Sequence, residues 1–188
     1  IRAGLAVLDL KPSEARVKLD SAGLVSTLFK VNDTYTARYD PSHCATSSLL
    51  DAQEGKRHRE TAIAFDRAQN RATFTLRDVL KNAVLATEQT QIPNCVHDII
   101  GAIQALRTAP PQPGQPATLP ISDGRKAAQV KIEAQEREEV TTPAGTFKTI
   151  RYEADLFNGV IHMRKGRAFV WLTDDARRLP VQMRLRMS

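Results

Sequence analysis

Hydrophobic and polar residues alternate with a period of two over much of this chain. In residues 179–187, the apolar side chains of Leu179, Val181 and Met183 are each separated by Pro or a polar residue. The same alternation recurs in residues 15–19, 71–76, 128–135 and 149–156. This period is typical of a β-strand with one buried and one solvated face. Because such one-sided strands occur in antiparallel sheets, the chain is predicted to be mainly β.

Residues 168–172 break the alternation, because their sequence AFVWL is apolar throughout. A strand that is apolar on both faces is expected at the centre of a sheet, covered on both sides. We therefore predict that Trp171 is buried and does not serve as an exposed stacking surface.

Residues that favour tight turns stand between the predicted strands. Residues 66–70 are predicted to form a hairpin loop, and residues 142–145 contain Pro143 and Gly145, which suit a turn. The dipeptide Asn158-Gly159 is a strong signal for a two-residue hairpin.

One amphipathic helix is predicted at residues 94–107, with Asn94 as its N-cap. Its apolar residues recur at helical spacing; they are Val96, Ile99, Ile100, Ile103 and Leu106. Pro110 then prevents the helix from continuing. A shorter helical stretch is predicted at residues 21–29, and residues 109–116 read as an extended Pro-rich connector.

These elements predict a single domain over residues 1–188, folded as a curved antiparallel sheet or incomplete barrel with one covering helix. The helix is expected on the concave, apolar face. A curved sheet of this kind makes a groove, and a groove that the helix does not fill could hold an acyl chain. The residues predicted to line it are apolar and mostly aliphatic: Val130, Ile132, Ile150, Tyr152 and Leu156.

The net charge of +6 bears on the class of partner and not on the predicted fold. A basic surface favours anionic partners such as lipid headgroups. The densest basic cluster, Lys56 to Arg59, contains no aromatic residues of the kind that single-strand binders use, so no nucleic-acid partner is predicted. The sequence also lacks a run of about 18 apolar residues, so no transmembrane segment is predicted.

Residues with catalytic or metal-binding chemistry are scattered. The four histidines are not spaced as metal ligands, and no nucleotide-binding motif occurs, so no metal and no cofactor is predicted. Asp40, Asp174 and Asp175 are carboxylates beside strand ends, where paired acids could act as in glycosidases. An acidic-basic turn at residues 174–178 is the simpler reading, and catalytic residues are therefore not predicted.

Two cysteines, Cys44 and Cys95, leave two interpretations open. An even number permits one disulfide, which would close a loop of about 50 residues and stabilise the fold by up to about 4 kcal/mol. The alternative is a pair of unrelated buried thiols.

Four segments resemble a bacterial envelope family known as domain-of-unknown-function family 3108. They are IRAG at residues 1–4, DIIGAIQALR at 98–107, VTTPAGTF at 140–147 and VWLTDDARRLPV at 170–181. The chain departs from the family pattern at Gly101 and Gln104, where Ser and Tyr are expected. The strand that normally precedes IRAG is also absent, so we expect a trimmed N-terminal strand.

The resemblance implies an exported protein, periplasmic or associated with the outer membrane. In such a compartment Cys44 and Cys95 are expected to form a disulfide. The family's plan is similar to that of the LolA and LolB lipoprotein carriers, in which a curved antiparallel sheet wraps over helices. The family has no established activity, so the resemblance carries over no catalytic residue.

The function expected from these observations is non-catalytic binding or assembly in the cell envelope. The predicted partner is a lipid or an envelope protein, with the membrane surface as an expected place of action. Two alternatives stay open: a carbohydrate-binding domain that uses an exposed aromatic platform, and an envelope hydrolase that uses paired carboxylates.

Overall fold

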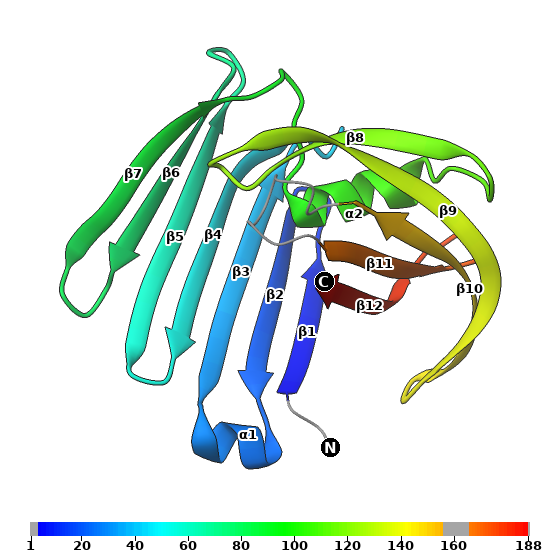
Figure 1. Ribbon diagram of the computed structural model, residues 1–188, viewed down its shortest axis with the longest axis horizontal. Helices are drawn as coiled ribbons and strands as arrows, with labels where there is room; N and C mark the ends of the chain where they lie inside the picture. Colours follow the sequence, from blue (N-terminus) through cyan, green and yellow to red (C-terminus); the bar gives the residue numbers. More distant parts are fainter. Residues whose placement is uncertain (1–3, 156–165, 188) are drawn as a thin grey trace.

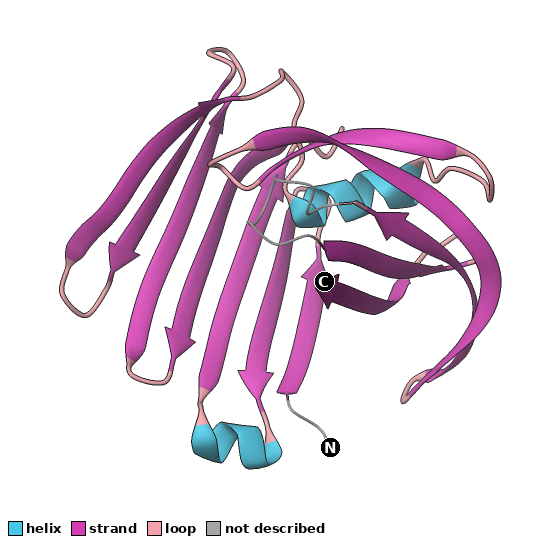
Figure 2. Ribbon diagram, viewed as in Figure 1, coloured by secondary structure: helices cyan, strands magenta, loops and turns pink. Residues whose placement is uncertain are grey.

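The computed structural model describes residues 4–155 and 166–187 of the chain. Strands make up most of the described residues, and two short helices complete the structure (Figure 2). The prediction of a mainly β fold is confirmed. Neither sheet closes into a barrel.

The first sheet contains seven antiparallel strands that neighbour each other in sequence order (Figure 1). They are β1 (Gly4–Leu10), β2 (Glu14–Ser21), β3 (Val31–Tyr39), β4 (Ala45–Glu54), β5 (Arg57–Asp66), β6 (Arg71–Asp78) and β7 (Ala83–Gln91). Each strand pairs with the next strand along the chain, so the connections alternate between the two ends of the sheet.

The second sheet contains five antiparallel strands in the order β12-β11-β10-β9-β8. They are β8 (Pro116–Ser122), β9 (Ala127–Thr142), β10 (Gly145–Ala154), β11 (Gly166–Thr173) and β12 (Pro180–Met187). This sheet is strongly bent and arches over the longer helix (Figure 1). The sequence predicts one curved sheet, whereas the structure contains two sheets, of which the second is strongly bent.

The helix α1 (Gly23–Leu28) lies between β2 and β3, within the predicted residues 21–29. The longer helix α2 (Ile99–Thr108) is shorter than predicted. The predicted start at residue 94 and the N-cap Asn94 are wrong, because Asp98 caps the helix through a hydrogen bond from the Gly101 N–H. Residues before Asp98 are extended and pair with strands instead.

The buried side of α2 also differs from the predicted stripe. Ala102 and Leu106 pack into the core of the second sheet, whereas Ile100 packs against the Ala15 and Ala37 cluster of the first. Ile99, predicted to be buried, is exposed. The helix is wedged between two sheets, and this position buries more than one of its faces.

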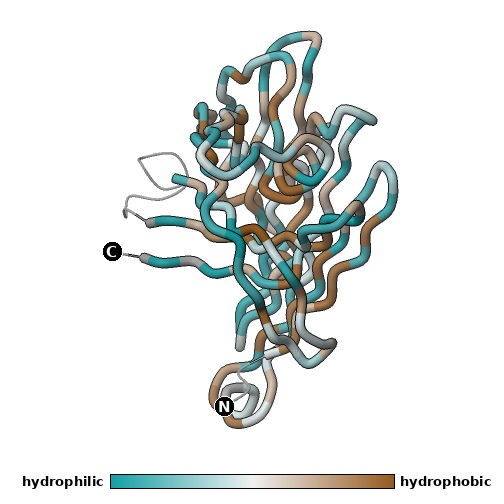
Figure 3. The backbone as a smooth tube through the Cα atoms, turned by 90° about the vertical axis from the view of Figure 1, so that its right-hand side faces the viewer, coloured by the Kyte–Doolittle hydropathy of each residue, from teal (hydrophilic) through white to brown (hydrophobic). Residues whose placement is uncertain are grey.

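Hydrophobic positions gather in the space between the layers (Figure 3). The core beneath α2 joins residues of β9, β10 and β11, and a second core joins β4, β5 and β6 to the segment after β7. The turn between β8 and β9 closes on this second core. Gly124, with φ +84°, approaches the Ile63 side chain so closely that an added Cβ would lie 2.7 Å from it.

The predicted central strand is confirmed as β11, which lies between β10 and β12. Leu172 faces the core beneath α2 and is fully buried. Trp171 faces the opposite side, yet it is only 4% exposed. Its indole N–H donates to Glu138 (2.7 Å), and the Arg184 guanidinium lies over its ring.

Two of the three predicted turns are confirmed. Residues 66–70 connect β5 to β6, and the turn after Thr142 leads into β10 at Gly145, whose φ is +129°. Asn158-Gly159 lies outside the described residues. No described helix has the length and apolar character needed to cross a membrane.

Candidate functional site

The two sheets are joined by the segment from Cys95 to Asp98. The Ala45 N–H of β4 donates to the Val96 carbonyl, and the His97 N–H donates to the Pro120 carbonyl of β8. Cys44 and Cys95 form a disulfide beside this junction, with Cα atoms 5.1 Å apart. The predicted disulfide is confirmed, and it holds the segment at the start of β4.

Asp98 connects the junction to the helix and to β3. Its carboxylate caps α2 and also accepts a 2.6 Å hydrogen bond from the Tyr35 hydroxyl. The side chain is only 2% exposed. Burial raises the pKa of Asp98, and the hydrogen bonds from Tyr35 and Gly101 oppose that rise by stabilising the ionised form.

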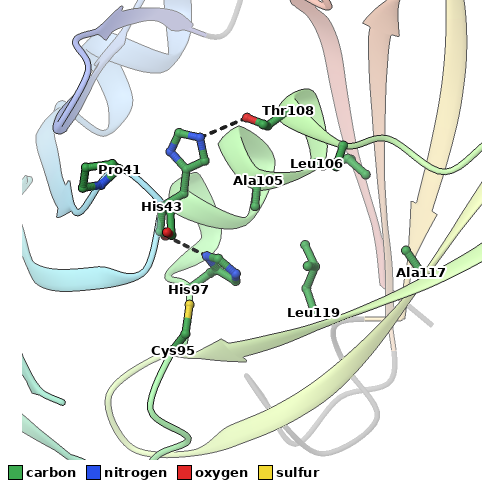
Figure 4. A pocket seen from close by; sticks show the side chains of 11 residues that line it. Pro41, His43, Cys95, His97, Ala105, Leu106, Thr108, Ala117 and Leu119 are labelled. Carbon is green, nitrogen blue, oxygen red and sulfur yellow. Dashed lines mark hydrogen bonds between the residues drawn. The ribbon is translucent and has the colours of Figure 1, made fainter. Parts of the chain in front are cut away.

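A pocket of about 300 Å³ opens beside this junction (Figure 4). It is bounded by the turn before β4, the segment after Cys95, the C-terminal half of α2 and the start of β8. Most of its walls are apolar, with contributions from Ala105, Leu106, Ala117 and Leu119. Its volume is at the low end of the range for small-molecule sites, about 300–1,000 Å³.

The polar side chains of the pocket include the imidazoles of His43 and His97 and the hydroxyls of Ser42 and Thr108. His97 Nδ1 lies 2.7 Å from the His43 carbonyl, which can only accept, so Nδ1 carries the proton. The Thr108 hydroxyl donates to the Gln104 carbonyl, so the His43 Nε2–H, 3.0 Å away, donates to Thr108. His43 Nδ1 is then a bare acceptor, buried without a partner among the described residues.

The His43 imidazole favours its neutral form at neutral pH, because its pKa is lowered. Burial lowers the pKa of His43, and the neighbouring His97 lowers it further, against a smaller opposing effect of Asp40. A neutral imidazole in an apolar wall suits an apolar ligand with at most a single hydrogen-bond donor.

The sequence-predicted groove residues lie in the core beneath α2. Val130, Ile132, Ile150 and Tyr152 are buried there against Ala102 and Leu106. Ile150 and Tyr152 also line a second pocket of about 230 Å³, beyond the C-terminal end of α2. Leu156, the fifth predicted residue, lies outside the described residues.

The three carboxylates considered as catalytic candidates each make structural contacts. Asp40 accepts hydrogen bonds from the Ser42 and Cys44 N–H groups and pairs with Arg67. Asp174 pairs with Arg137 on the surface. Among the described residues no group of three His, Cys, Asp or Glu side chains is placed to hold a metal ion.

The sequence profile of the family described as "Protein of unknown function (DUF3108)" matches residues 1–188. The chain belongs to this family. No match was found among the curated proteins. Among solved structures, the chain is similar to the crystal structure of a DUF1089 family protein from Pseudomonas aeruginosa, with 12% sequence identity and a TM-score of 0.50. The likeness covers 97% of this chain and 89% of the other, and it shows a shared fold alone.

In this DUF3108 protein, the motif at residues 170–181 is hydrogen-bonded to the C-terminal end of α2. Asp175 accepts hydrogen bonds from Thr173 Oγ1 and from the Arg177 and Arg178 N–H groups, which shapes the turn after β11. Arg178 then donates to the carbonyls of Arg107 and Thr108 at the end of the helix. Arg107 returns the contact by donating to the Arg178 carbonyl.

Sequence reasoning missed the pocket of this DUF3108 protein and the Tyr35–Asp98 pair. Tyr35 and Asp98 are separated by 63 residues, and no local pattern indicates that they meet. In the sequence, only the pair of cysteines Cys44 and Cys95 indicated that the segments on either side of the junction lie together.

Proposed function

We propose that this DUF3108 protein is a non-catalytic binding protein of the cell envelope that holds an acyl chain or similar apolar group. The observation that carries the proposal is the pocket beside α2, with its aliphatic walls and uncharged imidazole. Its volume of about 300 Å³ suits one short chain rather than a whole lipid.

The inner face of the seven-stranded sheet supports the same function. On β1 and β2, Leu8 and Leu19 lie on the same face as buried Ala15, because Leu8 pairs with Val17 and side chains two residues apart share a face. Leu8 and Leu19 are nevertheless exposed. The core face therefore extends beyond the part that α2 and the second sheet cover, and gives an amphipathic ligand additional apolar surface.

A periplasmic or outer-membrane-associated location is part of this proposal. The disulfide supports it, because disulfides persist in oxidising compartments such as the bacterial periplasm. The plan similar to the LolA and LolB carriers remains a prediction that points in the same direction.

Pocket-filling substitutions test the proposal. Ala105→Phe on α2 and Ala117→Leu on β8 each place extra carbons in the pocket. The measurement is the affinity for a fluorescent fatty-acid probe, with native mass spectrometry of protein purified from its own host to find a co-purifying lipid. Both variants should weaken probe binding by roughly tenfold or more.

Ala176→Phe is the matched control, because Ala176 lines the second pocket. It should leave the affinity for the probe unchanged. A protein that binds no probe and carries no lipid from its host would contradict the proposal, as would equal losses in all three variants.

A further inference from the structure

Three turns of the seven-stranded sheet share one end of the sheet. The antiparallel order places the α1 connection, the β4–β5 turn and the β6–β7 turn on the same side, opposite the turns that meet α2 (Figure 1). We call these segments the tip edge: residues 23–30, 54–57 and 79–85. The pocket beside α2 lies at the other end.

Large apolar side chains are exposed along the tip edge. On the α1 connection, Leu28 is 87% exposed, and Leu24 and Phe29 are also exposed. On the β6–β7 turn, Leu80 is 69% exposed and is followed by exposed Val84 and Leu85. Figure 3 shows hydrophobic positions at α1, far from the interior of the molecule. Burial in the core explains none of these residues.

Basic residues stand among these apolar side chains. Lys30, Lys56, Arg57 and Lys81 are all exposed, one or two on each of the three segments. Glu54 is the acidic residue within the tip edge, and Asp78 directly precedes it. The carboxylate of Asp78 accepts from the Lys81 N–H and so shapes the turn. Cations outnumber the acidic groups along the edge.

Two of the three segments are fastened to each other. The Gly55 N–H donates to the Lys30 carbonyl (2.7 Å). The Phe29 ring covers Gly55, where an added Cβ would lie 3.0 Å from the ring. The exposed apolar and basic groups of α1 and of the β4–β5 turn are thus held in a fixed arrangement before any partner is bound.

We propose that the tip edge docks on the surface of an anionic lipid bilayer. Leu24, Leu28 and Leu80 enter the boundary between headgroups and acyl chains, and the lysines and Arg57 contact lipid phosphates. A bilayer suits these residues better than a protein does, because the apolar side chains stand on separate turns with cations between them. This inference does not depend on the ligand pocket.

Flotation with lipid vesicles tests this docking. The full chain is mixed with vesicles of phosphatidylcholine alone or of phosphatidylcholine with phosphatidylglycerol, at low and at high salt. We expect binding to the anionic vesicles, weakened by salt because the charge contribution is screened. Leu24→Ser with Leu28→Ser should reduce the partition coefficient by roughly tenfold or more. Lys56→Gln with Lys81→Gln should reduce it roughly thirtyfold.

Matched controls carry the same changes elsewhere. Leu49→Ser with Ile99→Ser removes two exposed apolar side chains away from the tip edge, and Lys11→Gln with Lys148→Gln removes two distant charges. These controls should bind like the parent. Absence of binding to anionic vesicles, equal losses in the controls, or loss in the lysine variant alone would overturn the proposal. The last of these outcomes would show that the apolar residues do not enter the bilayer.

Discussion

At the scale of single residues, Asp98 links helix, strand and junction through one buried carboxylate. Its folded-state pKa is raised by burial, so its contribution to stability is present below its unfolded pKa and is lost as pH rises through the folded pKa. The Tyr35 hydroxyl limits this loss because it stabilises the ionised carboxylate. The contribution of Tyr35 to the free energy of unfolding therefore depends on pH.

Tyr35→Phe should therefore destabilise the protein by about 1–3 kcal/mol at neutral pH, and by less near pH 4, because the raised pKa of Asp98 shifts this carboxyl toward its protonated form as the pH falls. The measurement is the free energy of unfolding in urea at both pH values. Tyr39→Phe is the control, because the Tyr39 hydroxyl donates to the Lys11 carbonyl, which does not titrate. An effect of Tyr35→Phe that is equal at both pH values would contradict this account.

Gly101 is a second residue whose role depends on close contacts. Replacing Gly by Ala in a helix usually stabilises it by up to about 1 kcal/mol. Here an added Cβ would lie 2.8 Å from Asp98 Oδ1 and 2.9 Å from the His43 carbonyl oxygen. Gly101→Ala should instead cost about 1–3 kcal/mol of unfolding free energy in urea. Exposed Ile99→Ala on the same helix should change it by less than about 1 kcal/mol, and a stabilising Gly101→Ala would refute the close packing.

At the scale of elements, β11 contributes buried residues to the core beneath α2. Leu172 is 1% exposed, and an aspartate there would be a buried charge without a partner. Leu172→Asp should lower the unfolding free energy by more than about 4 kcal/mol or prevent folding. Thermal unfolding followed by circular dichroism measures the effect. Met183→Asp on the neighbouring β12, at an exposed position, should be far milder, and a Leu172→Asp melting point near the parent's would show that β11 is not central.

The turn after β11 is an element stabilised by ionised Asp175. Hydrogen bonds, first from the Thr173 hydroxyl and then from the Arg177 side chain, lower the pKa of Asp175 to about 2. Because this pKa is depressed, the stabilisation is present above the unfolded value of 3.8 and is lost as pH falls toward about 2. Asp175→Asn should flatten the acid limb of the stability curve in that interval.

The acid limb is measured by urea unfolding at successive pH values. Asp174→Asn removes the neighbouring charge and leaves the hydrogen bonds of Asp175 in place, so it should keep the slope. An Asp175→Asn variant with the parent's slope would mean that the turn does not depend on this carboxylate.

At the scale of the whole molecule, the disulfide fastens the segment that joins the two sheets. Cys44 and Cys95 are 51 residues apart in the chain, so the cross-link restricts a large part of the unfolded ensemble. Cys44→Ser with Cys95→Ser should lower the unfolding free energy by about 4 kcal/mol. Guanidinium unfolding measures it, and a reducing agent should reproduce the loss in the parent while leaving the double variant unchanged. Equal unfolding midpoints for parent and variant would contradict a structural role.

The sequence by itself determined six of the twelve described strands, two of the turns and the burial of Trp171. These features follow from local patterns, since a period of two residues or a Gly in a turn is decided within a few positions. The start of α2 was not predictable locally, because Val96 and His97 fit a helix as well as a strand. Their pairing with Ala45 and Pro120 decides between the two.

The pocket, the Tyr35–Asp98 pair and the tip edge were decided only by the tertiary structure. Each brings together side chains from segments far apart in the chain, and no local spacing encodes that meeting. The division into two sheets has the same origin. A strand with one apolar face must pack that face against another layer, but the sequence pattern does not say which helix or sheet forms that layer. That choice depends on where α2 and the disulfide hold the second sheet against the first.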